Sequence, residues 1–327
     1  NANAMLVANV NNVTALYGSR KVLKGVTFEI SLEDRLGLIG PNGSGKTTML
    51  KILLGEDVPS EGGVHIATGV RIGYVPQYLE GGDDELVMDW LIAEYVALEE
   101  ELRRTEQAMA VASTDELDAA MESYQQARDK YDDAEADRRP DEAQKVLDSL
   151  GLGGKEDQLI GTLSGGEKNV LSLARALMNE PDFLILDEPG NHLDFHGLAW
   201  LEEFLISFKG AVLIVSHNRH TLDRVATGIL TLEDGKVSRY LGGYSDYRAT
   251  RLRELLAQQA DYAANQKRLS QLEALVKRLE LTARARASKE AGRRLRSRRS
   301  QLAREEKQAV EKPVSEVSAI GAEFKDG

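Results

Sequence analysis

Eight residues near the N-terminus have the composition and spacing of a phosphate-binding loop. The stretch Gly40-Pro-Asn-Gly-Ser-Gly-Lys-Thr47 fits the pattern G-x-x-x-x-G-K-[ST]. It follows an apolar run at residues 36–39, predicted as a strand, and opens a predicted helix at residues 47–54. Glycines let backbone N–H groups close around phosphate oxygens, and a helix N-terminus adds a favourable field. The sequence therefore predicts a phosphate site formed by Asn42, Gly43, Ser44, Gly45, Lys46, Thr47 and Thr48.

A second candidate element ends in two adjacent carboxylates. The apolar run at residues 183–186 is predicted as a buried strand, and Asp187 and Glu188 follow it directly. Polar residues often simply terminate a strand, so this element is a weak signal by itself. Beside a phosphate loop the pair has a chemical use. Lys46 would reach the β- and γ-phosphates, Thr47 and Asp187 would bind Mg²⁺, and Glu188 would polarise an attacking water.

These residues need a scaffold of alternating strands and helices. The all-apolar run at residues 211–215 is typical of a parallel sheet covered on both faces. Strand-like runs on either side of Asp234-Gly235 predict a hairpin, and residues 84–150 and 170–178 predict helices. Because strands alternate with helices, the expected class is α/β.

The C-terminal part has a different pattern. Leu269, Leu272, Val276 and Leu279 are spaced by 3, 4 and 3 residues, as in a coiled-coil seam. This spacing predicts two antiparallel helices joined by a basic turn near residues 284–292, where Gly292 interrupts the pattern. Pro313 is expected to end the second helix.

Charge is distributed unevenly along the 327 residues, whose net charge is −12. Residues 80–150 hold 22 Asp/Glu against 7 Lys/Arg, whereas residues 248–312 hold 18 Lys/Arg against 8 Asp/Glu. The basic segment predicts a polyanionic partner, and the acidic insert is not expected to contact phosphates. A solvated helix face remains the alternative for either segment. Cysteine is absent, which excludes disulfides and thiolate sites and fits a cytoplasmic location.

Further motifs resemble those of ATP-binding-cassette (ABC) ATPases. Leu163-Ser-Gly-Gly-Glu167 resembles the family's signature motif, and Asn191-His-Leu-Asp194 resembles its D-loop. The resemblance implies a P-loop NTPase cassette that binds ATP and Mg²⁺ and hydrolyses ATP. It implies a fold with a mostly parallel sheet core, an antiparallel β subdomain and a helical subdomain. It further implies adenine stacking on Tyr17, a catalytic role for Glu188 and His217, and both a catalytic and a magnesium role for Gln77. The signature residues implied to bind nucleotide are Ser164, Gly165 and Gly166.

Within that family the details are similar to the ABC-F class, whose members act on ribosomes and lack transmembrane domains. The resemblance implies a cassette at residues 5–247 with an arm insert at 80–150, a basic linker at 248–312, and the start of a missing second cassette at 313–327. Gly190 and Asn218 depart from the Thr and Asp usual in the family. The basic residues implied to contact rRNA and P-site tRNA are Arg284, Arg286, Lys289, Arg293, Arg294, Arg296, Arg298 and Arg299.

Three interpretations of the whole chain remain open at this point. The preferred one is a ribosome-associated ABC-F factor in translation regulation or antibiotic resistance, with no membrane partner. The second is the nucleotide-binding subunit of a transporter, and the third a DNA-repair or chromosome-structure ATPase. The ABC-F resemblance also implies a second cassette as partner, from the same full-length chain or as a homodimer. An isolated cassette is therefore expected to bind ATP well and to hydrolyse it poorly.

Overall fold

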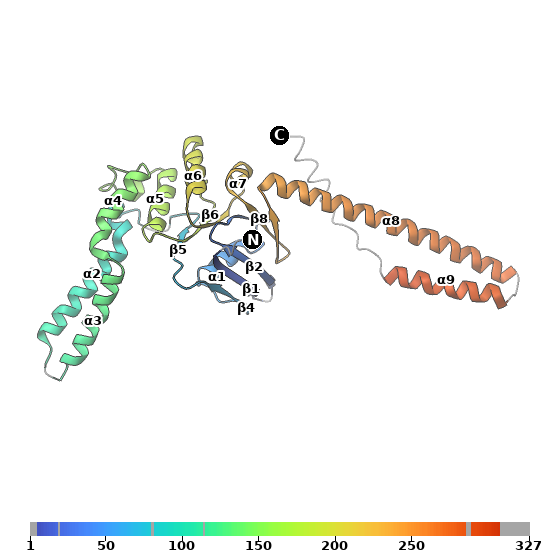
Figure 1. Ribbon diagram of the computed structural model, residues 1–327, viewed down its shortest axis with the longest axis horizontal. Helices are drawn as coiled ribbons and strands as arrows, with labels where there is room; N and C mark the ends of the chain where they lie inside the picture. Colours follow the sequence, from blue (N-terminus) through green and yellow to red (C-terminus); the bar gives the residue numbers. More distant parts are fainter. Residues whose placement is uncertain (1–4, 19, 80–81, 114, 286–288, 308–327) are drawn as a thin grey trace. The chain divides into compact units, whose positions relative to one another are not determined.

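The computed structural model describes residues 5–18, 20–79, 82–113, 115–285 and 289–307; for residues 282–291 no side chain is described. Contacts divide the chain into two units, Asn1–Ser245 and Asp246–Gly327. Figure 1 shows the elements of both units.

The first unit contains a six-stranded sheet of order β5-β6-β7-β3-β8-β9. Its strands are β3 (Arg35–Ile39), β5 (Ile72–Val75), β6 (Phe183–Asp187), β7 (Ala211–Val215), β8 (Gly228–Glu233) and β9 (Lys236–Leu241). The pairs β5–β6, β6–β7, β7–β3 and β3–β8 are parallel, and β8–β9 is the antiparallel hairpin predicted around Asp234-Gly235. Every residue of β6 and β7 is buried, because helices and the second sheet cover both faces.

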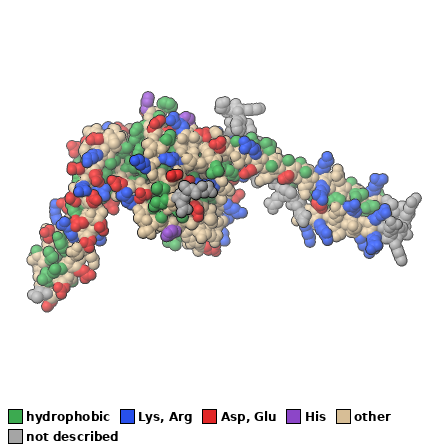
Figure 2. Space-filling view, viewed as in Figure 1, with side chains coloured by type: hydrophobic (Ala, Val, Ile, Leu, Met, Phe, Trp, Pro, Cys, Tyr) green, Lys and Arg blue, Asp and Glu red, His purple; other side chains and the backbone are tan. Residues whose placement is uncertain are grey.

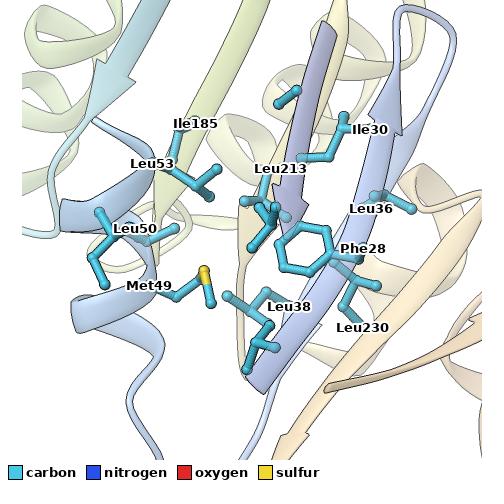
Figure 3. Packing of buried hydrophobic residues seen from close by; sticks show 14 of the residues in the cluster. Phe28, Ile30, Leu36, Leu38, Met49, Leu50, Leu53, Ile185, Leu213 and Leu230 are labelled. Atoms are coloured by element: carbon cyan, nitrogen blue, oxygen red, sulfur yellow. The ribbon is translucent and has the colours of Figure 1, made fainter. Parts of the chain in front are cut away.

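A second sheet is antiparallel, in the order β2-β1-β4. Its strands are β1 (Leu6–Tyr17), β2 (Arg20–Ser31) and β4 (Glu61–Ile66). Alternate residues of β2, such as Phe28 and Ile30, are buried in a shared core with β3, β7 and helix α1 (Lys46–Leu53). Figure 3 shows Met49, Leu50 and Leu53 of α1 packed in this core. The core therefore fixes α1, and with it the loop that precedes it.

The helical part of the unit follows β5. It consists of α2 (Val87–Val111), α3 (Leu117–Asp133), the short helix η1 (Ala136–Arg138), α4 (Arg139–Ser149), η2 (Ile160–Thr162) and α5 (Gly165–Leu177). Pro140 lies in the first turn of α4, where its missing N–H costs no hydrogen bond. These helices share a separate apolar core that includes Trp90, Leu147 and Leu171. The fold class expected from the sequence is confirmed: an α/β cassette with parallel and antiparallel sheets and a helical subdomain.

An arginine joins the sheet to the helix α6 (Phe195–Ser207). Arg35, at the start of β3, donates from Nε to the carbonyl of Leu205 at 3.0 Å. Its Nη2 donates to the carbonyls of Ile206 at 2.9 Å and Phe208 at 2.6 Å. The last carbonyls of a helix have no partner inside the helix, so this guanidinium caps the C-terminus of α6. Helix α7 (Arg219–Val225) lies between β7 and β8 in the chain.

The second unit is a pair of long helices, α8 (Tyr244–Ala285), which begins in the first unit, and α9 (Lys289–Lys307). Arg268 pairs with Glu305 at 2.6 Å and Arg299 with Glu280 at 2.5 Å, so the two helices run antiparallel as predicted. The turn was predicted near residues 284–292, which was too long, because α8 ends at Ala285 and α9 begins at Lys289. Gly292 lies inside α9, because one glycine lowers helix stability without ending a helix among good helix formers.

Some of the predictions fall on residues that are not described. Residues 313–327, expected to begin a second cassette, lie outside the described chain, and so do Arg286 and the side chains of Arg284 and Lys289. In the described part of the chain, the helices are too short or too polar to cross a lipid bilayer.

Gly45 gives a test of how the phosphate loop is packed against β2. Its φ is +107°, and a Cβ there would lie 2.6 Å from Val22 Cγ1. We expect Gly45→Ala to destabilise the fold by about 2–4 kcal/mol, from backbone strain and overpacking together. In a double-mutant cycle, Val22→Ala should relieve only the overpacking.

The control is Gly55→Ala. Urea unfolding measures the stability of both glycine variants. Gly55 has a φ of +76°, but a Cβ at this position would have no atom within 4 Å, so only backbone strain of about 1–2 kcal/mol is expected. Equal losses for the Gly45 and Gly55 variants would contradict close packing against Val22.

Candidate functional site

The phosphate loop joins the end of β3 to the start of α1 and is held by its own backbone. The Ser44 N–H donates to the Pro41 carbonyl at 3.1 Å. Lys46 Nζ donates to the carbonyls of Gly40 at 2.8 Å and Pro41 at 3.2 Å, so the side chain folds back along the loop. The Ser44 hydroxyl is buried and has no hydrogen-bond partner among the described residues. An unpaired buried hydroxyl in a loop of this shape fits an incoming phosphate oxygen.

The two carboxylates lie at the carboxyl end of β6. Asp187 is the last residue of the strand and is 8% exposed. Burial raises its pKa, and the charge of Lys46 opposes that rise. The same burial lowers the pKa of Lys46, and Glu188 and Asp187 oppose that fall. The attraction between Lys46 and the two carboxylates therefore opposes the effect of burial on each of the three groups.

Glu188 is fixed against the neighbouring strand. Its N–H donates to the Val215 carbonyl of β7 at 2.9 Å, and its φ of +51° is unusual for a residue with a side chain. Oε2 accepts from the backbone N–H of His217 at 3.3 Å, and Oε1 lies 3.4 Å from His217 Nε2. Burial raises the pKa of Glu188, although His217 lowers it in part. A carboxylate with a raised pKa is better suited to accept a proton.

These groups line a cavity of about 590 Å³. It unites the phosphate loop with the carboxyl ends of β5, β6 and β7. Most of the predicted residues lie on it: Asn42, Gly43, Gly45, Lys46, Thr47, Thr48, Gln77, Asp187, Glu188 and His217. The arrangement can hold a polyphosphate chain at one end and place a base and an imidazole near its terminus.

Three lining residues were not assigned to the nucleotide from the sequence. They are Val22, Asn191 and Val215. Asn191 belongs to the stretch that resembles a D-loop, so a signal for it was present. Val22 lies on β2, well before the phosphate loop in the sequence. The signal for its position was indirect: Val22 packs against residue 45, which therefore has to be glycine.

Five residues with predicted nucleotide contacts do not line this cavity. Ser44 belongs to the loop but is absent from the cavity lining. Tyr17, at the end of β1, is 63% exposed. Ser164, Gly165 and Gly166 lie at the N-terminus of α5 and are absent from the lining. The structure therefore separates the signature motif from the nucleotide cavity of its own chain.

The signature motif is a well-formed helix cap. Ser164 and Glu167 form a capping box: Ser164 Oγ accepts from the Glu167 N–H at 3.3 Å, and the Ser164 N–H and Oγ donate to Glu167 Oε2, each at 2.8 Å. Lys155 Nζ lies 2.8 Å from the other carboxylate oxygen. Lys155 and Ser164 together lower the pKa of Glu167 to about 2. The cap is thus fixed at neutral pH, and Ser164 stays exposed.

The residues at the cavity suit a magnesium ion. Thr47, Gln77 and Asp187 bring a hydroxyl, an amide and a carboxylate to one place, and Mg²⁺ prefers such oxygen donors. Nothing among the described side chains forms a cluster of three or more His, Cys, Asp or Glu that would bind a metal alone.

The two departures from the family pattern have local explanations. Asn218 caps α7, since its Oδ1 accepts from the N–H groups of His220 at 3.0 Å and Thr221 at 3.3 Å. Asn and Asp cap helices equally well, so the cap is kept without a further negative charge. At Gly190, a Cβ would lie 3.2 Å from Leu198 Cδ1, so a larger residue would need Leu198 to shift.

The second unit carries the predicted nucleic-acid residues that are described. Figure 2 shows Lys and Arg side chains gathered on the helical pair, whereas Asp and Glu are frequent on α2 and α3. Arg293, Arg294 and Arg298 line a groove of about 880 Å³ between α8 and α9, together with Leu275, Leu279 and Ser297. Arg293, Arg294, Arg296, Arg298 and Arg299 are all exposed.

Known proteins match both parts of the chain. A family model described as "ABC transporter" matches residues 23–191, and a second with the same description matches residues 230–320. Among solved structures, a nucleotide-free ATP-binding cassette of an ABC transporter has a TM-score of 0.57 and 20% identity. It covers 75% of this chain and 94% of its own. At this identity the match shows the fold alone.

Curated relatives are more similar in sequence. The tylosin resistance ATP-binding protein TlrC of Streptomyces fradiae is 40% identical, over 78% of this chain and 47% of its own length. The energy-dependent translational throttle protein EttA of Mycobacterium tuberculosis is 33% identical, over 82% and 48%. ATP-binding cassette sub-family F member 3 of Mus musculus is 31% identical, over 97% and 43%.

The chain spans about half the length of these curated relatives. Cassettes of this kind generally hydrolyse ATP. The first family model alone covers more than half of the chain, and it includes the phosphate loop, the signature motif and the two carboxylates. The chain therefore belongs to the ATP-binding-cassette family of ATPases, and its relatives agree with the ABC-F class that the sequence motifs resemble.

Proposed function

We propose that this chain is the ATP-binding and ATP-hydrolysing cassette, residues 5–247, and the basic linker, residues 248–312, of a soluble, cytoplasmic ABC-F protein. Its binding to the ribosome would be gated by ATP, in translation regulation or antibiotic resistance. The observation that carries the enzymatic part is the cavity that joins Lys46 and Thr47 to Asp187, Glu188 and His217. Tyr17 remains the candidate for stacking on the purine, at the end of β1.

In the proposed reaction, backbone N–H groups of the loop and Lys46 hold the β- and γ-phosphates. Glu188 accepts a proton from the attacking water, and His217, 3.4 Å from Glu188 Oε1, holds the carboxylate in place. Thr47, Gln77 and Asp187 would hold Mg²⁺, which neutralises phosphate charge when bound. Most of the rate gain in such a site comes from positioning and fixed charges.

The signature motif supports a second cassette as partner. Ser164, Gly165 and Gly166 lie outside the cavity of their own chain, at the N-terminus of a 13-residue helix. A helix N-terminus with an exposed cap is suited to receive an anion. We propose that this motif meets the γ-phosphate held by another cassette, from the other half of the full-length protein or from a second copy. ATP would then stabilise the closed pair, and hydrolysis would release it.

Replacing the proposed base tests the reaction. Glu188→Gln should abolish hydrolysis while leaving ATP affinity within about threefold, because the amide cannot accept the proton. The variant should also unfold at a higher temperature at pH 7. The raised pKa of Glu188 means that its ionised form is less favourable in the folded than in the unfolded chain.

The pH profile has a definite sign. As pH falls through the raised pKa, Glu188 takes up a proton and the rate should fall, at a higher pH than for a solvent-exposed Glu. A steady-state phosphate-release assay measures both the loss of hydrolysis in Glu188→Gln and the pH dependence of the wild-type rate. Hydrolysis by Glu188→Gln at the wild-type rate would exclude Glu188 as the base.

Dependence on protein concentration tests the second cassette. The rate per molecule should be low in dilute solution and rise with protein concentration, because each site would need a signature motif from another copy. Light scattering under the same conditions reports whether ATP drives dimer formation. A high rate per molecule that does not change with concentration would show that one cassette suffices.

The ribosomal part of the proposal has two supports. One relative is named a translational throttle protein, which points to translation, and another is named a tylosin resistance protein, which points to antibiotic resistance. The other support is the exposed arginines of α9, which release counterions when they bind RNA phosphates. We propose that this surface contacts folded rRNA and P-site tRNA through their backbones.

Charge reversal tests that surface. In the Glu188→Gln background with ATP, the chain should sediment with ribosomes. A triple variant in this background should bind ribosomes at least tenfold more weakly; its changes to Glu are at Arg293, Arg294 and Arg298. The matched control reverses Arg103, Arg128 and Arg138, which changes net charge equally on the acidic arm and should bind normally. Equal ribosome binding by the two triple variants would show that these arginines of α9 do not contact the ribosome.

A further inference from the structure

Helix α5 is linked by a side chain to the turn that carries Glu188. Asn169 lies on α5, two residues beyond the capping residue Glu167, and is 9% exposed. Its Nδ2 donates a hydrogen bond to the backbone carbonyl of Asn191. Asn191 lines the nucleotide cavity, so this amide connects the signature helix to the wall of its own chain's site.

The turn from Glu188 to Asn191 is itself closed by a hydrogen bond. The Asn191 N–H donates to the Glu188 carbonyl at 3.1 Å. On the other side, the Glu188 N–H donates to Val215 of β7 at 2.9 Å. Glu188 has a φ of +51°, a conformation that a residue with a side chain keeps only where the surroundings impose it. Asn169 supplies one of those constraints, from outside the sheet.

The contact between α5 and this turn is close. A Cβ at Gly165 would lie 3.0 Å from His192 Cβ, and one at Gly166 would lie 3.1 Å from the His192 carbonyl oxygen. His192 also has a positive φ, of +66°. The start of α5 thus packs directly on the residue after Asn191, and a displacement of α5 would be passed to the turn.

We propose that Asn169 is a positioning residue for hydrolysis, which transmits the position of the signature helix to Glu188 within the same cassette. The inference rests on the proposed role of Glu188 as the base. Engagement of the signature motif by a neighbouring cassette's ATP would thereby set the base for the ATP in this one. Asn169 itself is not expected to touch the nucleotide.

Two substitutions remove the donor in different ways. Asn169→Asp keeps the size of the side chain but turns a carboxylate toward the Asn191 carbonyl. Asn169→Leu replaces the amide with an apolar group, and so avoids a buried charge should the Asp variant fold poorly. The matched control is Ser172→Ala on the same helix. Ser172 is 3% exposed, and its hydroxyl donates only along the helix, to the Lys168 carbonyl at 3.1 Å.

Two readouts separate positioning from general damage. In both Asn169 variants kcat should fall about tenfold or more while KM stays within about twofold, because binding is intact and the base is misplaced. Hydrogen exchange of the Asn191 amide should become at least tenfold faster, with exchange in β6 and β7 unchanged. Ser172→Ala should match the wild type in both.

The outcomes distinguish this inference from the proposed function. Unchanged exchange at residues 188–192 in both Asn169 variants would overturn the inference, whatever their activity. Equal changes in the Asn169 variants and Ser172→Ala would overturn it as well. If the wild type hydrolyses ATP no faster than Glu188→Gln, the proposed function fails, and the exchange experiment still decides whether Asn169 holds the turn.

Discussion

The nucleotide cavity depends on a balance between one ammonium group and two carboxylates. Burial alone would drive Lys46 toward its neutral form and Asp187 and Glu188 toward theirs. The attraction between Lys46 and each carboxylate opposes this effect of burial, whereas the negative charge of Asp187 adds to it at Glu188. When both carboxylates are ionised, the cavity carries more negative than positive charge from these three groups. A polyphosphate would add more negative charge, part of which a bound divalent cation would neutralise.

The topology of the six-stranded sheet brings the charged groups of the cavity together. In the order β5-β6-β7-β3-β8 all strands are parallel, so their carboxyl ends meet at one edge. Gly40 follows β3, Gln77 follows β5, Asp187 ends β6 and His217 follows β7. No two of these four residues come from the same strand. The sheet therefore assembles a site that a single contiguous motif could not form.

Much of the fold and the cavity could be predicted from the sequence, because strand ends and glycine loops are local signals. The loop at residues 40–47 and the carboxylates after 183–186 are both recognisable from short-range patterns. Val22 and Asn169 could not be found in this way. Their roles depend on contacts with Gly45 and Asn191, across 23 and 22 residues. The helix that continues through Gly292 was missed because the glycine was taken as an interruption, whereas the good helix formers around it carry the helix through.

The cap that Arg35 places on α6 restricts which sequences can build this cassette. Three carbonyls, those of Leu205, Ile206 and Phe208, are satisfied by one planar guanidinium that reaches them from β3. A lysine offers a single nitrogen on a flexible stem and could not span the same set. The exchange of arginine for lysine, harmless on most surfaces, would here leave helix-end carbonyls without partners. Position 35 should therefore vary little between homologues, although it lies far from the nucleotide and touches no phosphate.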